Sequence, residues 1–464
     1  MPKSRLVVVS NRVTAVSEKK AAQAGGLAVG VMAALKNTGG LWFGWSGELT
    51  SAPSGNLKKV KVGRVEFGLV DLNEQDFAGY YAGFANRTIW PLFHYRLDLA
   101  SFQHEWYHTY RSVNECFARI LLNEVTDDDL IWVHDYHLMP LATELRRLGC
   151  KARIGFFLHI PFPPVEIFTT LPWHRQIAGD LAAFDVVGLQ TGTDLRHFTN
   201  YVELEINGVA LRDRKLRAMD REFIGDVYPI GIDSTDFLAK TQSREAVREA
   251  NRLAKVLLGR KLIMGVDRLD YTKGIPERLN AFQTLLANYP DHRGAVSYMQ
   301  ILAPSREDVP EYEELRDIVD AMAGRLNGAY STADWVPLRY INRSYSQRAL
   351  AGFFRLSRVG LVTPLRDGMN LVASEYVAAQ DPDDPGVLVL SRFAGSASHL
   401  DGALIVNPYD SFHLADTLHA ALEMTLDERQ DRYQRMMTSI ERNNIHVWRQ
   451  RFLADLAAPS VAPA

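Results

Sequence analysis

Short runs of apolar, often β-branched residues recur along the chain, and stretches with helical periodicity separate them. Continuous apolar runs of this length are typical of strands buried in a parallel sheet. The eight predicted strands cover residues 6–10, 130–134, 154–159, 186–190, 262–266, 296–301, 359–363 and 387–390. Their alternation with helices predicts a doubly wound α/β architecture.

The predicted strands fall into two sets, which the segment 227–233 separates. Pro229 and Gly231 interrupt the pattern there, and a new charged helix begins at about Ser243. A chain of 464 residues also exceeds what one hydrophobic core usually serves. We therefore predict two Rossmann-like domains, residues 1–232 and 233–443, facing across a deep interdomain cleft.

Composition and charge narrow the choice of ligand. The net charge is −3, and no basic stripe points to nucleic acid or to an anionic membrane. The apolar run after the basic start is too short for a signal peptide, and no segment is long enough to span a bilayer, which favours a cytoplasmic location. Cys116 and Cys150 fit neither a metal spacing nor a disulfide framework. We therefore expect the ligands of this protein to be small molecules.

The segment 366–375 is the most informative part of the chain. Asp367, Gly368 and Glu375 place an acid, a turn and a second acid between the strand 359–363 and a helical stretch at 370–380. Free backbone N–H groups at such a helix start favour anions and oxygen-rich ligands. An isolated Arg-Asp-Gly is also a common surface turn. We interpret the segment as a candidate cradle for a sugar nucleotide.

A second candidate follows the strand 262–266. Arg268 and Lys273 can converge there on a phosphate, with Arg306 after the next strand adding charge. The alternative pairs both cations with Asp267 and Asp270 in a surface network, and the spacing leaves the two interpretations equal.

A paired glycine, Gly25-Gly26, opens an apolar helix near the N-terminus. It matches neither the dinucleotide pattern nor a P-loop, which disfavours a dehydrogenase or an NTPase. Such a pair lets a diphosphate or sugar approach the backbone, and a turn with positive φ explains it equally well.

In the first half, Asp135 and His159 end neighbouring predicted strands and are suited to binding sugar hydroxyls or managing a proton. Aromatic residues such as Trp45, Tyr81 and Trp90 suit carbohydrate faces, although core packing explains most aromatics. His134 and His137 have metal-like spacing without an identifiable third ligand. We predict no metal.

Eight ordered motifs together resemble retaining glycosyltransferase family 20 over essentially the whole chain. They are Val9-Ser10-Asn11-Arg12, Ala24-Gly25-Gly26-Leu27, Trp42-Phe43-Gly44-Trp45-Ser46-Gly47, Trp90-Pro91-Leu92-Phe93-His94-Tyr95, His134-Asp135-Tyr136-His137, Phe157-Leu158-His159-Ile160-Pro161-Phe162-Pro163, Val266-Asp267-Arg268-Leu269-Asp270-Tyr271-Thr272-Lys273-Gly274 and the segment 366–375.

The resemblance implies the GT-B fold, with the C-terminal helix at 444–464 packing back on the first domain. It implies transfer of glucose from UDP-glucose to glucose 6-phosphate with retention, which gives α,α-trehalose 6-phosphate and UDP. UDP-glucose is then a substrate, and neither a cofactor nor a metal is expected. Relatives often form homodimers or homotetramers, and a separate phosphatase would act on the product.

The resemblance also assigns roles to residues. Arg268 and Lys273 would bind the UDP diphosphate and stabilise its departure, Glu375 the ribose hydroxyls, and Asp367 the donor glucose. The other donor-binding residues would be Gly25, Gly26, Gly368, Met369, Asn370, Leu371 and Val372. The acceptor-binding residues would be Arg12, Trp45, Tyr81, Trp90, Asp135 and Arg306, and the catalytic residues Asp135, His159, Arg268, Lys273 and Asp367.

Two other readings of the motifs stay open. One is a glucosylglycerol-phosphate synthase or a related pseudo-glycosyltransferase, which differs in the acceptor. The other is a catalytically silent sugar-phosphate sensor, against which the complete donor motif argues.

Overall fold

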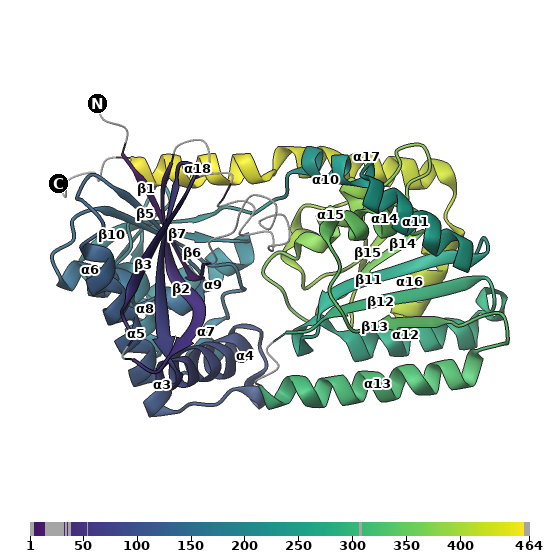
Figure 1. Ribbon diagram of the computed structural model, residues 1–464, viewed down its shortest axis with the longest axis horizontal. Coiled ribbons are helices and arrows are strands. Elements are labelled where there is room, and N and C mark those ends of the chain that lie inside the picture. The colour runs from purple at the N-terminus through teal and green to yellow at the C-terminus, as the bar shows by residue number, and fades with distance from the viewer. Residues whose placement is uncertain are drawn as a thin grey trace. The chain divides into compact units, whose positions relative to one another are not determined.

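The computed structural model describes residues 4–13, 32, 35, 39–52, 54–305 and 309–458. The chain divides into two compact units. Unit 1 comprises Met1–Pro229 with His446–Ala464, and unit 2 comprises Ile230–Ile445. Each unit contains one sheet with helices on its faces (Figure 1).

Unit 1 contains a ten-stranded sheet in the order β3-β4-β2-β1-β5-β6-β7-β10-β9-β8. The run from β4 to β10 is parallel, whereas β3, β9 and β8 pair antiparallel at the edges. The strands are β1 (Leu6–Arg12), β2 (Gly40–Thr50), β3 (Leu57–Val62), β4 (Val65–Asn73), β5 (Leu130–His134), β6 (Arg153–Phe157), β7 (Val186–Leu189), β8 (Val209–Ala210), β9 (Lys215–Ala218) and β10 (Arg221–Val227).

The helices of unit 1 connect and cover these strands. Those that lie within the described residues are α3 (Glu74–Asp76), η1 (Phe77–Ile89, a π-helix), α4 (Trp90–Phe93), η2 (Leu97–Leu99), α5 (His104–Leu122), η3 (Tyr136–Leu138), α6 (Leu141–Arg147), α7 (Val165–Phe168), α8 (His174–Ala182), α9 (Gly192–Glu205) and α18 (Ile445–Ala457).

Unit 2 contains a six-stranded sheet, parallel throughout, in the order β13-β12-β11-β14-β15-β16. The strands are β11 (Lys261–Arg268), β12 (Val296–Ala303), β13 (Leu338–Ile341), β14 (Val359–Val362), β15 (Val387–Ser391) and β16 (Leu404–Val406). Its helices are α10 (Ser234–Thr241), α11 (Arg244–Leu257), η4 (Tyr271–Lys273), α12 (Ile275–Asn288), η5 (Pro290–His292), α13 (Pro310–Tyr330), α14 (Gln347–Leu356), α15 (Leu371–Ala379), η6 (Gly395–Ser398), α16 (Ser411–Glu423) and α17 (Leu426–Arg442). Helices α10, α11, α14 and α15 lie on one face of this sheet, and α12 and α13 lie on the other (Figure 1).

The last helix, α18, belongs to the core of unit 1. The ring of Trp448 lies 4.8 Å from that of Trp132 on β5, and the ring of Phe452 stacks on Trp132 at 4.9 Å. Gly155 and Gly188 leave room for Phe452, because a Cβ at either position would come within 2.8 Å of its ring. Gly155 on β6 and Gly188 on β7 therefore leave the space into which α18 packs.

Two α/β units with mainly parallel sheets confirm the predicted fold class. Each of the eight predicted strands coincides with an observed one, and all eight are central, buried strands of the two sheets. The interdomain cleft stays a prediction. None of the described helices combines the length and the apolarity that crossing a bilayer requires.

Candidate functional site

Lys273 and Asp367 form the centre of the candidate donor site in unit 2. Lys273 ends η4, and Asp367 lies in the turn between β14 and α15. Lys273 Nζ donates to Asp367 Oδ2 at 2.5 Å, and Asn370 Nδ2 donates to the same oxygen at 3.0 Å. Because both side chains of the ion pair are mostly buried, with 11% and 15% exposed, the pair fixes the direction of the lysine.

The turn that carries Asp367 is held by the segment after β15. Asp367 N donates to Phe393 O at 3.1 Å, and Ser396 N donates to Met369 O at 2.9 Å. A Cβ at Gly395 would come within 1.8 Å of Gly368 O, so only glycine allows this approach. The first part of the segment 366–375 is thus a turn that backbone hydrogen bonds hold against the segment after β15, and the rest begins α15.

Helix α15 begins directly after this turn. Asn370 precedes its first residue with φ 66° and, among the described residues, makes no side-chain capping hydrogen bond. The first N–H groups of α15 therefore have no side-chain acceptor there and are suited to an anion. Met369 is buried, whereas Leu371 and Val372 are half-buried on the first turn.

Arg268 ends β11 and is 44% exposed, with Nη2 3.4 Å from Asp270 Oδ2. Its contact with Asp270 matches the network alternative in part. Lys273, by contrast, pairs with Asp367. Both cations thus form ion pairs, and they differ in exposure, because Arg268 is 44% exposed and Lys273 only 11%.

Arg278, on α12, is a residue that the sequence analysis missed. Its guanidinium is fully buried and donates to Asp267 Oδ2 at 2.7 Å and to Thr363 Oγ1 at 2.9 Å. Nη2 also donates to Lys273 O at 3.1 Å. Arg278 thus connects the ends of β11 and β14 with the backbone of the candidate lysine, and no spacing rule marks it as special.

Glu375 lies on α15 and is half-buried. Burial raises the pKa of Glu375 to about 7, and the positive charge of Lys240 on α10 opposes that shift. Lys240 was also missed by the sequence analysis. A carboxyl with this pKa titrates near neutral pH, as carboxyls in functional sites often do.

Arg12, Trp45 and Tyr81 lie together in unit 1. The Arg12 guanidinium lies 5.6 Å from the ring centroid of Trp45, and the Trp45 and Tyr81 rings are 5.6 Å apart. Tyr81 in turn stacks on His137 at 5.8 Å. Gly47, with φ 91°, leaves the space for Arg12, since a Cβ there would come within 2.6 Å of its Nε. The structure therefore brings three predicted acceptor residues into one cluster.

Trp90 is a buried residue of α4. Its ring lies 4.2 Å from His94 and 5.8 Å from Tyr136, which fits a core position as well as a pocket wall. Gly25, Gly26 and Arg306, which also belong to the predicted site, lie outside the described residues.

Asp135 and His159 are joined at the ends of β5 and β6. Asp135 has φ 78°, and its Oδ1 accepts from His159 N at 3.2 Å. His159 Nε2 lies 3.1 Å from His134 Nδ1, so one of these facing nitrogens donates to the other. Burial lowers the pKa of His159 to about 3 and holds the pKa of His134 well below its ordinary value. Both imidazoles are therefore neutral at physiological pH.

Among the described residues, no group of three or more His, Cys, Asp and Glu side chains is placed to hold a metal ion. The prediction that no metal is required stays a prediction.

Two mainly parallel α/β units, each with charged and polar side chains where its strands end, are the arrangement of GT-B glycosyltransferases. The model of glycosyltransferase family 20 matches residues 4–458, and the chain belongs to that family, which confirms the resemblance of the motifs.

Named relatives are similar over almost their full length. The trehalose-6-phosphate synthase of Sinorhizobium fredii is 49% identical over 98% of this chain and 99% of its own. A Burkholderia xenovorans α,α-trehalose-phosphate synthase (UDP-forming) in complex with glucose-6-phosphate has a TM-score of 0.94 at 46% identity, covering 98% of this chain and 100% of that one. An E. coli trehalose-6-phosphate structure bound with UDP-2-fluoro glucose has a TM-score of 0.93 at 46% identity, covering 98% and 99%.

Proposed function

We propose that the protein transfers glucose from UDP-glucose to glucose 6-phosphate with retention at the anomeric carbon, forming α,α-trehalose 6-phosphate and UDP. The observation that carries the proposal is the locked Lys273–Asp367 pair at the start of α15, in a chain that matches family 20 from residue 4 to residue 458. The named relatives, two of them in structures with a sugar phosphate or a nucleotide-sugar analogue bound, support the substrates.

In the proposed donor site, Arg268 and Lys273 bind the diphosphate. The uncapped amides of α15 add hydrogen-bond donors, and Asp367 accepts from the glucose hydroxyls. Glu375 is assigned the ribose hydroxyls. Because Lys273 already contacts Asp367, one rigid unit would position both the sugar and its leaving group.

In the proposed acceptor site, Arg12 supplies charge for the acceptor phosphate, and Trp45 and Tyr81 supply a wall for the sugar ring. Asp135 accepts from acceptor hydroxyls. The assignments of Trp90, Gly25, Gly26 and Arg306 rest on the family resemblance alone.

The proposed chemistry places the reaction on one face of the donor sugar. The glucose–phosphate bond breaks, the acceptor hydroxyl attacks the same face, and the departing diphosphate takes the acceptor's proton. Arg268 and Lys273 stabilise the charge that develops on the diphosphate, which makes them the main catalytic residues. His159, neutral because of its low pKa, acts as a hydrogen-bonding group near the anomeric carbon and not as an acid.

The test is proton NMR of the purified protein with UDP-glucose and an equimolar mixture of glucose 6-phosphate and glycerol 3-phosphate, in EDTA. A 1,1-linked α,α product with release of UDP supports the synthase and its independence of metal. A glycerol adduct would transfer the assignment to a glucosylglycerol-phosphate synthase, and the absence of any product would favour a sugar-phosphate sensor.

A second experiment tests whether Lys273 stabilises the departing diphosphate. Lys273→Ala should lower kcat by about 100-fold or more, as loss of a transition-state donor does elsewhere. Lys255→Ala is the matched control, because Lys255 is exposed on α11. Near-normal turnover in Lys273→Ala would contradict the role. A cytoplasmic location, a homo-oligomeric assembly and a separate phosphatase acting on the product remain predictions.

A further inference from the structure

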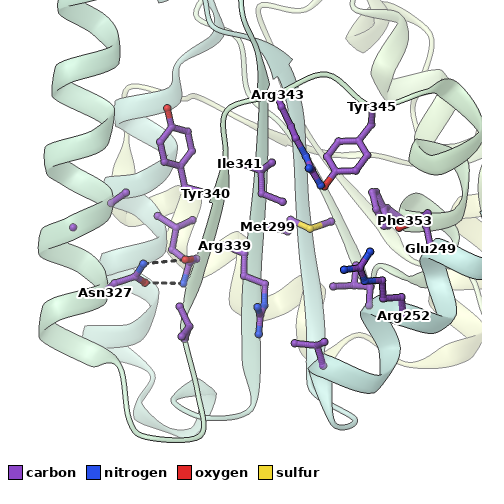
Figure 2. Close-up of a pocket in the computed structure, with 16 residues that line it drawn as sticks. Glu249, Arg252, Met299, Asn327, Arg339, Tyr340, Ile341, Arg343, Tyr345 and Phe353 are labelled. Atoms are coloured by element: carbon purple, nitrogen blue, oxygen red, sulfur yellow. Dashed lines mark hydrogen bonds between the residues drawn. The ribbon is translucent and has the colours of Figure 1, made fainter. Parts of the chain in front are cut away.

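Unit 2 contains a cavity of about 630 Å³ at the β13 edge of its sheet, and the charged side chains that line it do not converge. Figure 2 shows Arg339 and Arg343 pointing away from one another, with Met299 between them. A single anionic group therefore does not contact both guanidinium groups. The predicted acceptor residues of unit 1 differ in this respect, because polar and aromatic side chains from several strands meet there on one helix.

That helix is η1, a π-helix of 13 residues. Such helices are rare and are frequently found at functional sites. Two consecutive residues of η1 contact different strands. The Tyr80 hydroxyl donates to Asn11 Oδ1 on β1 at 2.8 Å. The Tyr81 ring packs on that of Trp45 on β2 at 5.6 Å. Because Asn11 directly precedes Arg12, η1 connects the predicted phosphate-binding arginine with the predicted wall for the sugar.

Tyr80 itself is not accessible to a ligand. Its side chain is fully buried, and its ring stacks on that of Tyr110 of α5 at 5.9 Å. Burial raises the pKa of Tyr80 well above its ordinary value, because the phenolate is poorly solvated there. The hydroxyl therefore stays protonated at physiological pH and acts as the donor to Asn11.

Two glycines fix the position of η1 against α5. A Cβ at Gly79 would come within 2.7 Å of the Thr109 side chain, and a Cβ at Gly83 would come within 2.6 Å of the Trp106 ring. Any larger residue at either position would push the two helices apart, since the interior is closely packed. The helix that carries both tyrosines is therefore held against α5 in one position.

Helix η1 also contacts η3, which begins directly after Asp135. The Tyr81 ring stacks on that of His137 at 5.8 Å, and Asn86 Oδ1 accepts from the Tyr136 hydroxyl at 3.2 Å. Together with the contacts to β1 and β2, these interactions connect η1 to three elements that carry or adjoin predicted acceptor residues. A displacement of η1 would therefore change the spacing between those residues.

We propose that Tyr80 is a positioning residue for the acceptor, because its hydroxyl fixes Asn11 and thereby sets the place of Arg12 relative to the Tyr81 ring. The spacing between a phosphate-binding guanidinium and an aromatic wall determines which sugar phosphate fits between them. This role rests on the proposed function, and it adds to the acceptor site a residue that does not touch the substrate.

Steady-state kinetics of Tyr80→Phe test this role, because the variant keeps the ring and removes only the hydroxyl. The KM for glucose 6-phosphate should rise about fivefold, the factor that one hydrogen bond supplies, while kcat and the KM for UDP-glucose stay within about twofold of wild type. Tyr228→Phe is the matched control, since this fully buried tyrosine of unit 1 donates instead to Asp455 Oδ2 of α18, at 2.7 Å. An equal rise of both KM values, or an equal change in Tyr228→Phe, would overturn the proposal.

A double-mutant cycle tests whether Tyr80 acts through Asn11. Asn11→Ala should also raise the KM for glucose 6-phosphate, and Tyr80→Phe combined with Asn11→Ala should raise it no further, because both changes remove the same hydrogen bond. Asn11→Ala alone tests the role if Tyr80→Phe does not fold by circular dichroism. Additive effects of the two changes would show that the residues act separately and would overturn the proposal.

Isothermal titration with glucose 6-phosphate distinguishes failure of this proposal from failure of the proposed function. If wild type binds glucose 6-phosphate and forms no product, the proposed transferase function fails, and the dissociation constants of wild type and Tyr80→Phe still test the role of Tyr80. A dissociation constant about fivefold higher in the variant supports that role, and equal constants overturn it. A wild type that does not bind glucose 6-phosphate would overturn both.

Discussion

Replacing Arg278 by methionine would test whether a buried cation holds together the strand ends of unit 2. The guanidinium is fully buried and contacts four groups. It donates to Asp267 Oδ2 at 2.7 Å, Gln300 Oε1 at 2.9 Å, Thr363 Oγ1 at 2.9 Å and Lys273 O at 3.1 Å. Methionine preserves much of the volume and removes every donor.

The dominant cost is the carboxylate left behind. Burial already raises the pKa of Asp267, and the charge of Arg278 opposes that rise. Breaking a buried pair from one side costs roughly 3–5 kcal/mol. Proton uptake limits this cost, because protonating a carboxyl of ordinary pKa 3.8 costs about 4 kcal/mol at pH 7 and about 1.6 kcal/mol at pH 5. The variant should therefore lose about 4 kcal/mol of stability at pH 7 and clearly less at pH 5.

Hydrogen–deuterium exchange read by mass spectrometry suits this test, since it reports the opening free energy of β11 and β12 separately from unit 1. Thr363→Val is the control for a single lost hydrogen bond and should cost about 1 kcal/mol at either pH. In Arg278→Met combined with Asp267→Asn, the pH dependence should disappear. A loss below about 1 kcal/mol at pH 7, or an equal loss at both pH values, would refute the reasoning.

Three other perturbations have expected outcomes. Trp448→Ala removes a ring that packs on Trp132, so the free energy of unfolding of unit 1 should fall by about 3–5 kcal/mol in urea titrations; an unchanged midpoint would contradict the role of α18. The pKa of Glu375 is raised to about 7, so its contribution to stability is present below pH 4.5 and is lost as the pH rises through 7. In Glu375→Gln, hydrogen-exchange measurements at pH 5 and pH 8 should show a smaller loss of stability than in wild type. An equal loss in both proteins would contradict the raised pKa. The pKa of His159 is lowered to about 3, so wild type should lose stability as the pH falls from 6.5 toward 3. His159→Gln should lose less stability over that range, as measured by circular dichroism. Equal acid sensitivity of the two proteins would show that His159 does not titrate as inferred.

Hydrophobic pattern was sufficient for eight interior strands, but it missed the edge strands and also the interior strands β2, β4 and β10. Strands such as β5 and β15 are buried on both faces and therefore appear as continuous apolar runs. Strand β3 has the sequence Leu-Lys-Lys-Val-Lys-Val with exposed or half-buried positions, as expected for an edge strand. Strand β2 is interior, but three glycines interrupt its apolar run. The alternation of lysines in β3 is not distinguishable from a loop without knowing which strand lies alongside.

The same limit explains which features of the candidate site could be predicted from the sequence. Asp367 and Lys273 were recognisable because each follows a buried strand, where ligands bind in α/β folds. Their pairing was not recognisable, because it requires β11 and β14 to be neighbours, which the order of strands along the chain does not reveal.

Arg278 shows the physical reason most clearly. On the sequence it is one of several charged residues at the start of a helix, where exposed arginines are common. Its environment exists only because β12, β11 and β14 are adjacent and place Gln300, Asp267 and Thr363 around one guanidinium. Gly265 completes it, since a Cβ there would come within 2.8 Å of Arg278 Nη1. Because Arg278 neutralises the charge of Asp267, that carboxylate attracts Arg268 and Lys273 less strongly. The half-exposed Arg268 is then the cation of this motif that an incoming anion reaches most readily.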